Sequence, residues 1–281
     1  MTTMRFAQVF AAVILGIFIV MAIAAPWIAP YDPLAGTLGR RLRPPAWITT
    51  SAPVASLNWL GTDAVGRDVF SRLLHGARSS LIVAAAAIAV AGVIGTTIGM
   101  ISGYFGGWTD RILMRIVDLA LSFPMILLAL LVGVVFGASL VNVVFVIALL
   151  LWSQYARMAR GETLKIKHME YVDLARTAGV SSMGILVRHV LPKIMSVLVV
   201  VATLQVGTVI LLESSLSFLG VGVPPPTPSW GTMIADGRSY LATAWWLSLF
   251  PGLAILAVVL SVNVLGDALA DRAHAKAGRD G

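Results

Sequence analysis

Residues 119–156 read LALSFPMILLALLVGVVFGASLVNVVFVIALLLWSQYA, and this stretch contains no charged side chain. A helix that crosses a bilayer needs about 20 apolar residues. A run of 38 residues is therefore too long for one crossing and long enough for two. The small residues Gly137, Ala138 and Ser139 favour a break near its middle. The stretch predicts two membrane-spanning helices, the first starting near Ile112, and hence an all-α integral membrane protein.

The composition of the whole chain supports this fold class. Of its 281 residues, 58% are hydrophobic and only 12% are charged, whereas a soluble domain is about a quarter charged. The absence of cysteine excludes disulfides, thiolate metal sites and cysteine nucleophiles. The formal net charge of +7 is expected to come from basic loops at the cytoplasmic face. No RNA-binding motif supports a nucleic-acid partner.

Four further apolar stretches bring the expected number of spans to six. A cleaved signal peptide is the alternative for the first of them, but an apolar region of about 7–15 residues is typical of signals and this one is much longer. In the second, Gly95 and Gly99 have the GxxxG spacing that lets two helix backbones approach closely. The four spans are expected at Phe6–Ile28, Ser79–Gly103, Ile194–Leu212 and within Ser239–Gly266.

The distribution of lysine and arginine predicts the orientation. With the N-terminus inside, 13 of the 20 basic residues lie in inner segments and 7 in outer segments, and cytoplasmic loops carry an excess of positive charge. Both termini are therefore expected in the cytoplasm. We expect two parts: residues 1–78, the first span plus an extracytoplasmic segment, and residues 79–281, a core of five spans.

The end of the extracytoplasmic segment has a helical pattern. Thr62 or Asp63 could cap a helix over residues 64–75. Asp68 and Arg72 on its polar face have the i,i+4 spacing of an ion pair. We expect this helix to lie in the membrane interface.

The most informative polar segment on the inner side runs from Ser153 to Lys193. A helix over residues 167–178 is expected to end at Gly179, which tolerates the left-handed conformation at the residue after a helix. A second short helix from about Ser182 is expected to end at Pro192. On physical grounds alone this segment could dock into another protein or lie on the lipid surface.

From Glu170 the segment reads EYVDLARTAGVSSMGILVRHVLP, which resembles the EAA loop of ABC importer permeases. The family pattern is Glu-Ala-Ala, three residues, Gly and, further on, Leu-Pro. Two of the three EAA positions depart from it, since Asp replaces Glu and Leu replaces the first Ala. The resemblance implies a coupling helix that docks on an ATPase, in a loop at about 160–193. It assigns that role to Glu170, Asp173, Leu174, Ala175, Arg176, Gly179, Leu191 and Pro192.

Further segments resemble the C-type permease of dipeptide, oligopeptide and nickel importers, and together they cover nearly the whole chain. The C-terminus departs from that pattern, because no Asp-Pro follows Gly266-Asp267. The segments are Leu60-Gly61-Thr62-Asp63, Gly66-Arg67-Asp68, Gly103-Tyr104-Phe105-Gly106-Gly107, ESSLSFLGVG over residues 213–222, PPPTPSWG over residues 224–231, and Phe250-Pro251-Gly252.

The resemblance implies partners and a location in the bacterial inner membrane as well as a fold. It implies a heterodimer with a second, related permease, two ATPases that carry the ATP and Mg, and an extracytoplasmic substrate-binding protein. Peptides are the expected substrate, with nickel or another small solute as the alternative. An ion-coupled secondary transporter would instead show an internal repeat and charges at the membrane midplane, and neither is found in the sequence. A purely structural subunit would tolerate changes in the loop.

The chain itself shows no catalytic motif. None of its four lysines ends a glycine-rich phosphate loop, and its four histidines lack metal-ligand spacing, so no cofactor or metal is expected on it. Two carboxylates near predicted span ends remain. Asp118 is expected to pair locally with Arg115. Glu213 is expected to line the translocation path, cap a short outer helix or meet the partner permease.

Overall fold

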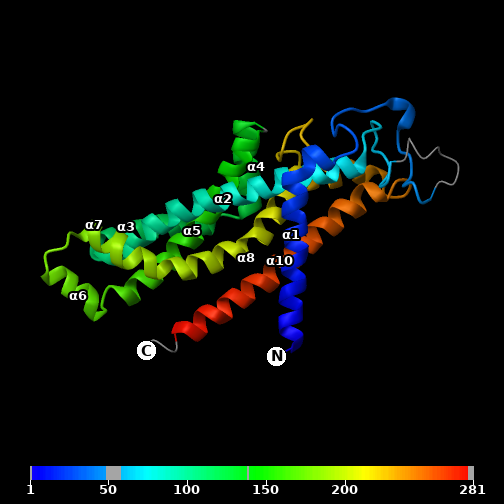
Figure 1. The fold of residues 1–281 in the computed structure, drawn as a ribbon. Coiled ribbons are helices and arrows are strands. Elements are labelled where there is room, and N and C mark those ends of the chain that lie inside the picture. Colours follow the sequence, from blue (N-terminus) through cyan, green and yellow to red (C-terminus); the bar gives the residue numbers. More distant parts are fainter. Residues whose placement is uncertain (1, 49–57, 138, 278–281) are drawn as a thin grey trace.

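The computed structural model describes residues 2–48, 58–137 and 139–277, and its regular elements in these ranges are helices. Four long helices lie side by side along one axis and form the body (Figure 1). They are α2 (Val69–Phe105), α5 (Leu140–Ile166), α8 (Leu191–Phe218) and α10 (Trp246–Ala277). The first helix, α1 (Thr2–Ile28), crosses this body and packs on α2 and α10.

Within the described residues, five helical segments are long and apolar enough to cross a membrane. Helices α3 (Gly107–Ser122) and α4 (Met125–Phe136) make a sixth if the pair counts as one span. These two helices are bent by 89° at residues 123–124. The span expected from near Ile112 to the break at Gly137 is therefore two helices rather than one. Proline restricts the preceding residue to extended backbone, and Phe123 before Pro124 has φ −82° and ψ 136°.

The predicted break after the third span is confirmed. Helix α4 ends at Phe136, Gly137 has a φ of +76°, and α5 starts at Leu140. The hydroxyl of Ser139 caps α5 by accepting a hydrogen bond from the backbone N–H of Asn142 at 3.0 Å. Ala138 lies outside the described residues.

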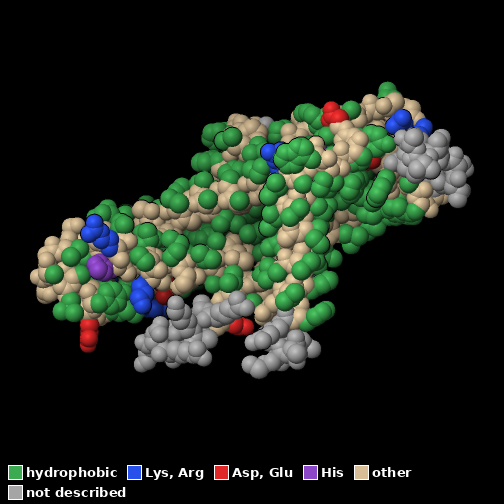
Figure 2. All heavy atoms as spheres, viewed as in Figure 1, with side chains coloured by type: hydrophobic (Ala, Val, Ile, Leu, Met, Phe, Trp, Pro, Cys, Tyr) green, Lys and Arg blue, Asp and Glu red, His purple; other side chains and the backbone are tan. Residues whose placement is uncertain are grey.

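Close packing of α2 on α5 fixes the centre of the body. A Cβ atom on Gly95 would overlap the carbonyl oxygen of Trp152, and one on Gly99 would overlap that of Ala156. The GxxxG spacing thus brings two backbones together, as predicted. Outside this contact the long helices expose apolar side chains such as Val93 and Val141. Hydrophobic side chains are spread along the whole body in Figure 2.

The start of α2 differs from the prediction. The helix begins at Val69, and its cap is Asp68, whose carboxylate accepts from the N–H and the hydroxyl of Ser71 at 2.8 Å. Residues 64–68 form a turn because Gly66 sits at φ +82°, which a right-handed helix cannot include. The predicted pair of Asp68 with Arg72 does not form, and no separate interfacial helix exists in these residues.

The short elements gather at the two ends of the body (Figure 1). At one end, the α6 end, lie α6 (Glu170–Thr177), α7 (Ser182–Ile185) and the π-helical turn η3 (Leu186–Val190). The other end, the loop end, holds η1 (Leu38–Arg40), residues 58–68, α9 (Trp230–Gly237) and η4 (Arg238–Tyr240).

Candidate functional site

The predicted coupling helix is α6, a helix of eight residues rather than twelve, because residues 167–169 form a turn. One face of α6 packs on the body: Val172 is fully buried, and Tyr171 and Ala175 are half-buried against the core. The opposite face is free, and Leu174 is 68% exposed. An apolar side chain this open at the tip of the molecule is available to a partner.

Gly179 ends α6 in the way that the sequence predicted. Its φ is +80°, and its N–H donates to the carbonyl of Arg176 at 3.1 Å. The next N–H, of Val180, donates to the carbonyl of Ala175 at 3.1 Å. These two bonds form a Schellman motif, which satisfies the last carbonyls of the helix and turns the chain sharply. The turn sets the angle between α6 and the helical segment that follows.

The charged residues of α6 are exposed. Glu170 and Asp173 lie in the first turn, where negative charge interacts favourably with the helix dipole. Asp173 also pairs with Arg176 at 3.2 Å, and both side chains are more than half exposed. Such a surface pair contributes little to stability, so the carboxylate of Asp173 remains free to exchange Arg176 for a partner's cation.

Leu191 and Pro192 lie within a continuous helical segment, which corrects the expectation that Pro192 ends a short helix. Helices α7, η3 and α8 run without interruption from Ser182 to Phe218. Proline lacks an N–H and clashes with the carbonyl four residues earlier. The π-helical turn η3 widens the helix just before Pro192, with the N–H of Leu191 bonded to the carbonyl of Leu186.

Three contacts that the sequence did not reveal tie α6 to the body. Lys167 donates to the carbonyl of Gly103 at 2.9 Å, and the guanidinium of Arg176 lies 5.9 Å from the ring centre of Tyr104. Both partners are at the end of α2. The rings of Tyr171 and His189 are 6.3 Å apart. Lys167 lies in the turn before α6, so the other two contacts are the ones that join α6 itself to α2 and to η3.

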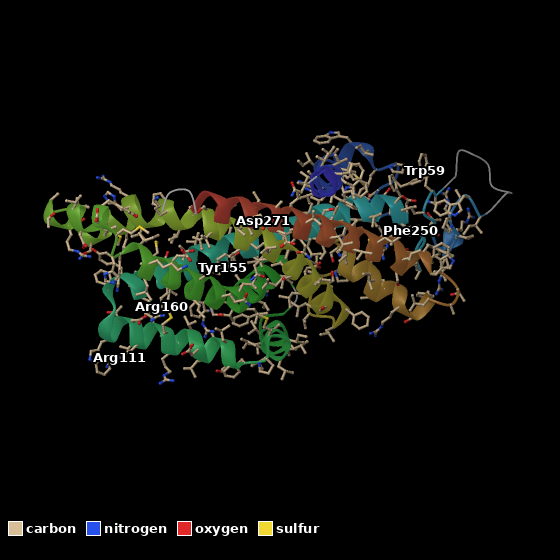
Figure 3. All side chains as sticks on the ribbon, turned by 90° about the horizontal axis from the view of Figure 1, so that it is seen from below. Trp59, Arg111, Tyr155, Arg160, Phe250 and Asp271 are labelled. Carbon is tan, nitrogen blue, oxygen red and sulfur yellow. The ribbon has the colours of Figure 1, made fainter. Side chains whose placement is uncertain are left out.

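An ion pair joins α3 and α5 near the α6 end of the body. Asp110 of α3 accepts from Arg160 of α5 through both carboxylate oxygens, at 2.5 and 2.7 Å, and also from the hydroxyl of Ser102 in α2. Arg160 projects from α5 in Figure 3. Bidentate arginine–carboxylate pairs are strong and directional. This clamp holds three helix ends together near the attachment of α6.

Asp118 does not pair with Arg115, which corrects the sequence prediction. Its carboxylate accepts from Arg157 of α5 at 2.8 Å, and both side chains are more than half exposed. The partner is 39 residues away in the sequence. Local spacing could not reveal it.

Glu213 lies inside α8 and is completely buried within this chain. Its carboxylate accepts from the hydroxyls of Ser217 at 2.8 Å, Ser229 at 2.9 Å and Ser80 at 3.2 Å. Ser229 caps α9, and Ser80 belongs to α2. Glu213 has no exposed surface in this chain, and its hydrogen bonds join the capping residue of α9 to two long helices. Its place on a translocation path stays a prediction.

Comparison with known families agrees with this architecture. Residues 95–276 match the family described as the binding-protein-dependent transport system inner membrane component. Residues 7–45 match the N-terminal TM domain of oligopeptide transport permease C. The first family covers α5, α6 and α8, and the second covers α1.

Curated relatives are similar over nearly the full chain. A probable D,D-dipeptide transport system permease of Escherichia coli K12 is 39% identical over 267 residues, which is 95% of this chain and 87% of the relative. A glutathione transport system permease of Pectobacterium atrosepticum is 41% identical, with the same coverage. A di/tripeptide transport system permease of Pseudomonas aeruginosa is 39% identical over 89% of this chain and 82% of the relative.

A solved structure shares the fold. The inward-facing MetNI methionine ABC transporter has a chain that superposes with a TM-score of 0.57 at 19% identity, covering 72% of this chain and 95% of that one. Together with the family matches and the relatives, this shows that the chain belongs to the binding-protein-dependent transport system inner membrane components and is a multi-pass permease subunit of an ABC importer.

Proposed function

We propose that this chain forms half of the translocation path for short peptides, beside a second, related permease. The relatives are named for transport of D,D-dipeptides, glutathione and di/tripeptides. These substrates share a short peptide backbone, which favours peptides over nickel. A substrate-binding protein outside the cell would deliver the peptide, and two ATPases inside would bind ATP and Mg.

The observation that carries this proposal is the free face of α6. Leu174 is exposed on α6, and Met169, Met183 and Val187 on the adjoining segments are also open. These four exposed apolar side chains at the α6 end are here called the tip patch, and the charges of Asp173 and Arg176 lie on the same helix as Leu174. An apolar centre with a charged rim is the usual anatomy of a protein interface. The tip patch suits a groove on an ATPase.

The contacts of α6 suggest how ATP would drive transport. Closure of the two ATPases would move α6, and its ties to Gly103, Tyr104 and His189 would pass that movement to α2 and α8. The permease would then change from inward-open to outward-open. A ligand shifts such an equilibrium only by binding the two states with different free energies. ATP must therefore favour the ATPase arrangement that α6 fits in the outward-open state.

The same proposal fixes the orientation. The α6 end would face the cytoplasm, where the ATPases are, and the loop end would face outward. Both termini would then be cytoplasmic, in agreement with the excess of lysine and arginine in the inner segments. Arg279, which contributes to that excess, lies outside the described residues.

Substitution of Gly179 tests the coupling role. No atom lies within 4 Å of a Cβ added there, but φ is +80°, a conformation that costs a β-branched residue roughly 1–2 kcal/mol. Gly179→Val should change the turn and reduce ATP-dependent uptake of a labelled dipeptide in proteoliposomes by at least tenfold. Gly179→Asn is the matched control, because Asn tolerates this conformation, and it should keep most of the uptake.

Both variants should be present in the membrane at wild-type levels, since residue 179 is exposed. Unchanged uptake by the Gly179→Val complex would disprove the coupling role. The partners are tested separately, by mild-detergent purification of the tagged chain and mass spectrometry. We expect two ATPases and a second permease, and recovery of this chain alone after cross-linking would contradict the proposal.

A further inference from the structure

The loop end contains a cavity of about 400 Å³, here called the loop-end pocket. Its walls come from the residues before and within the first turn of α2, from α9 and η4, and from the start of α10. Five charged side chains line it: Asp63, Arg67, Arg72, Asp236 and Arg238. Three arginines against two aspartates leave one positive charge without a counter-charge.

Both carboxylate oxygens of Asp63 already accept hydrogen bonds from residues of the same turn. One carboxylate oxygen accepts from the N–H groups of Val65 and Arg67 at 2.9 Å, and the other accepts from the guanidinium of Arg67 at 2.6 Å. The side chains of Asp63 and Arg67 are 9% and 15% exposed. The Asp63–Arg67 ion pair forms one side of the pocket. Because the two side chains already pair with each other, they interact only weakly with a third charged group.

Arg72 is the incomplete member of the cluster. Its side chain is 4% exposed, and its nearest carboxylate oxygens are 3.5 Å away on Asp63 and 3.7 Å away on Asp236. Both distances exceed those of a good charge-assisted hydrogen bond. Among the described residues, its buried Nη1 atom has no hydrogen-bond partner. A buried guanidinium with an unused N–H group is a site for an acceptor that the chain does not itself supply.

Asp236 lies nearest to another nitrogen of this guanidinium, Nη2, and leaves Nη1 unpaired. Its side chain is half-exposed and lies 3.7–3.8 Å from the guanidinium groups of Arg67 and Arg72. Burial of this carboxylate raises its pKa, although Arg72 and Arg67 act in the opposite direction. At these distances neither arginine makes a good charge-assisted hydrogen bond with Asp236. A carboxylate that came closer would interact better.

Arg238 stands at the rim of the pocket. It is exposed, and its guanidinium stacks on the ring of Phe218 with 5.0 Å to the ring centre. Stacking fixes the direction of the guanidinium while leaving its N–H groups free for a charged partner. The pocket thus has a buried cation at its base and an oriented cation at its opening.

We propose that the loop-end pocket receives an acidic side chain of the extracytoplasmic substrate-binding protein, which replaces Asp236 beside Arg72. This inference rests on the proposed function, because that function places the loop end outside the cell. One additional carboxylate would balance the single excess positive charge of the pocket. The position of the pocket at the end of the molecule, on elements outside the candidate spans except for the first turns of α2 and α10, makes it reachable by a docked protein.

The test measures the affinity of the substrate-binding protein for the complete importer in nanodiscs by biolayer interferometry. Asp236→Asn removes the competing carboxylate and should tighten the Kd by several-fold. Arg238→Gln removes the cation at the rim and should weaken it by about tenfold. Arg111→Gln, a charge change at the opposite end of the body, is the control and should leave the Kd unchanged.

Several outcomes would overturn the inference. If Asp236 only neutralises the arginines structurally, Asp236→Asn will lower the thermal stability of the complex and will not tighten docking. If a free peptide is the true ligand, labelled dipeptide will bind the importer without its binding protein, and Arg238→Gln will weaken that binding alone. If the binding protein does not bind the wild-type complex, both this inference and the binding-protein part of the proposed function are overturned. If it binds, but with the same Kd for the wild type, Asp236→Asn and Arg238→Gln, only this inference is overturned.

Discussion

The two ends of the body use their polar side chains in opposite ways. At the loop end, Asp68 and Asp63 are buried and hydrogen-bonded to neighbouring residues, and Glu213 in the adjoining part of α8 is completely enclosed. At the α6 end, Glu170, Asp173 and Arg176 are exposed. Buried polar groups stabilise a fold when all of them are satisfied, whereas exposed ion pairs contribute little.

This difference indicates that the polar side chains of the loop end serve the stability of the chain, whereas those of the α6 end are open to other proteins. The loop end is held together by its own chain, so that α9 and the start of α2 form a firm wall around the loop-end pocket. At the α6 end, the side chains of the tip patch are 42–68% exposed and therefore contribute less to the packing of this chain. Substitutions at the two ends should therefore have effects of different kinds.

The largest effect on stability is expected from Glu213→Ala. The change leaves the hydroxyls of Ser80, Ser217 and Ser229 without their shared acceptor, and each unsatisfied buried group costs about 1–3 kcal/mol. The apparent Tm of the detergent-solubilised protein, followed by tryptophan fluorescence, should fall by several degrees. Ser215→Ala, on the exposed side of the same helix, is the control. An equal Tm for both variants would contradict the view that the loop end is held by this carboxylate.

A smaller loss of stability is expected from Asp110→Ala. The change removes a bidentate ion pair with Arg160 and a hydrogen bond from Ser102. Because both charged side chains are partly exposed, the cost should be about 1–2 kcal/mol. Asp118→Ala breaks a more exposed pair with Arg157 and should change stability by less than about 0.5 kcal/mol. Chemical unfolding of the two variants in parallel measures the difference, and equal losses would show that the clamp has no special role.

The smallest effect on stability is expected from Leu174→Glu. Since Leu174 is 68% exposed, its replacement should change the free energy of unfolding by less than about 0.5 kcal/mol. Recovery of the ATPases with the tagged permease should nevertheless drop strongly, because a charge then lies in the apolar tip patch. Leu174→Ala introduces the residue that the EAA pattern carries and should keep the ATPases bound. If Leu174→Glu instead lowered the stability and left the ATPases bound, the contrast drawn between the two ends would be wrong.

Local features of the sequence were sufficient for several parts of the structure. Gly137 and Ser139 marked the helix break, Gly179 marked the end of α6, and the spacing of Gly95 and Gly99 marked a close helix contact. In each case the reason is the backbone itself, since glycine permits a left-handed φ or a near approach that other residues do not. Pro124 was a signal of the same kind, and attention to the residue before it would have revealed the bend after α3.

The partners of the charged residues could be identified only from the tertiary structure. Asp118 pairs with Arg157 rather than Arg115, and Asp110 pairs with Arg160, 50 residues away. Glu213 gathers serines from α2, α8 and the cap of α9. Which side chains meet depends on which helices pack together, and the apolar stretches do not specify that order. The sequence alone determined the apolar segments, the break after Phe136 and the end of α6 at Gly179, because these depend on hydrophobicity and backbone freedom. Only the packed helices decided where each charge is satisfied, because an ion pair depends on distance in space.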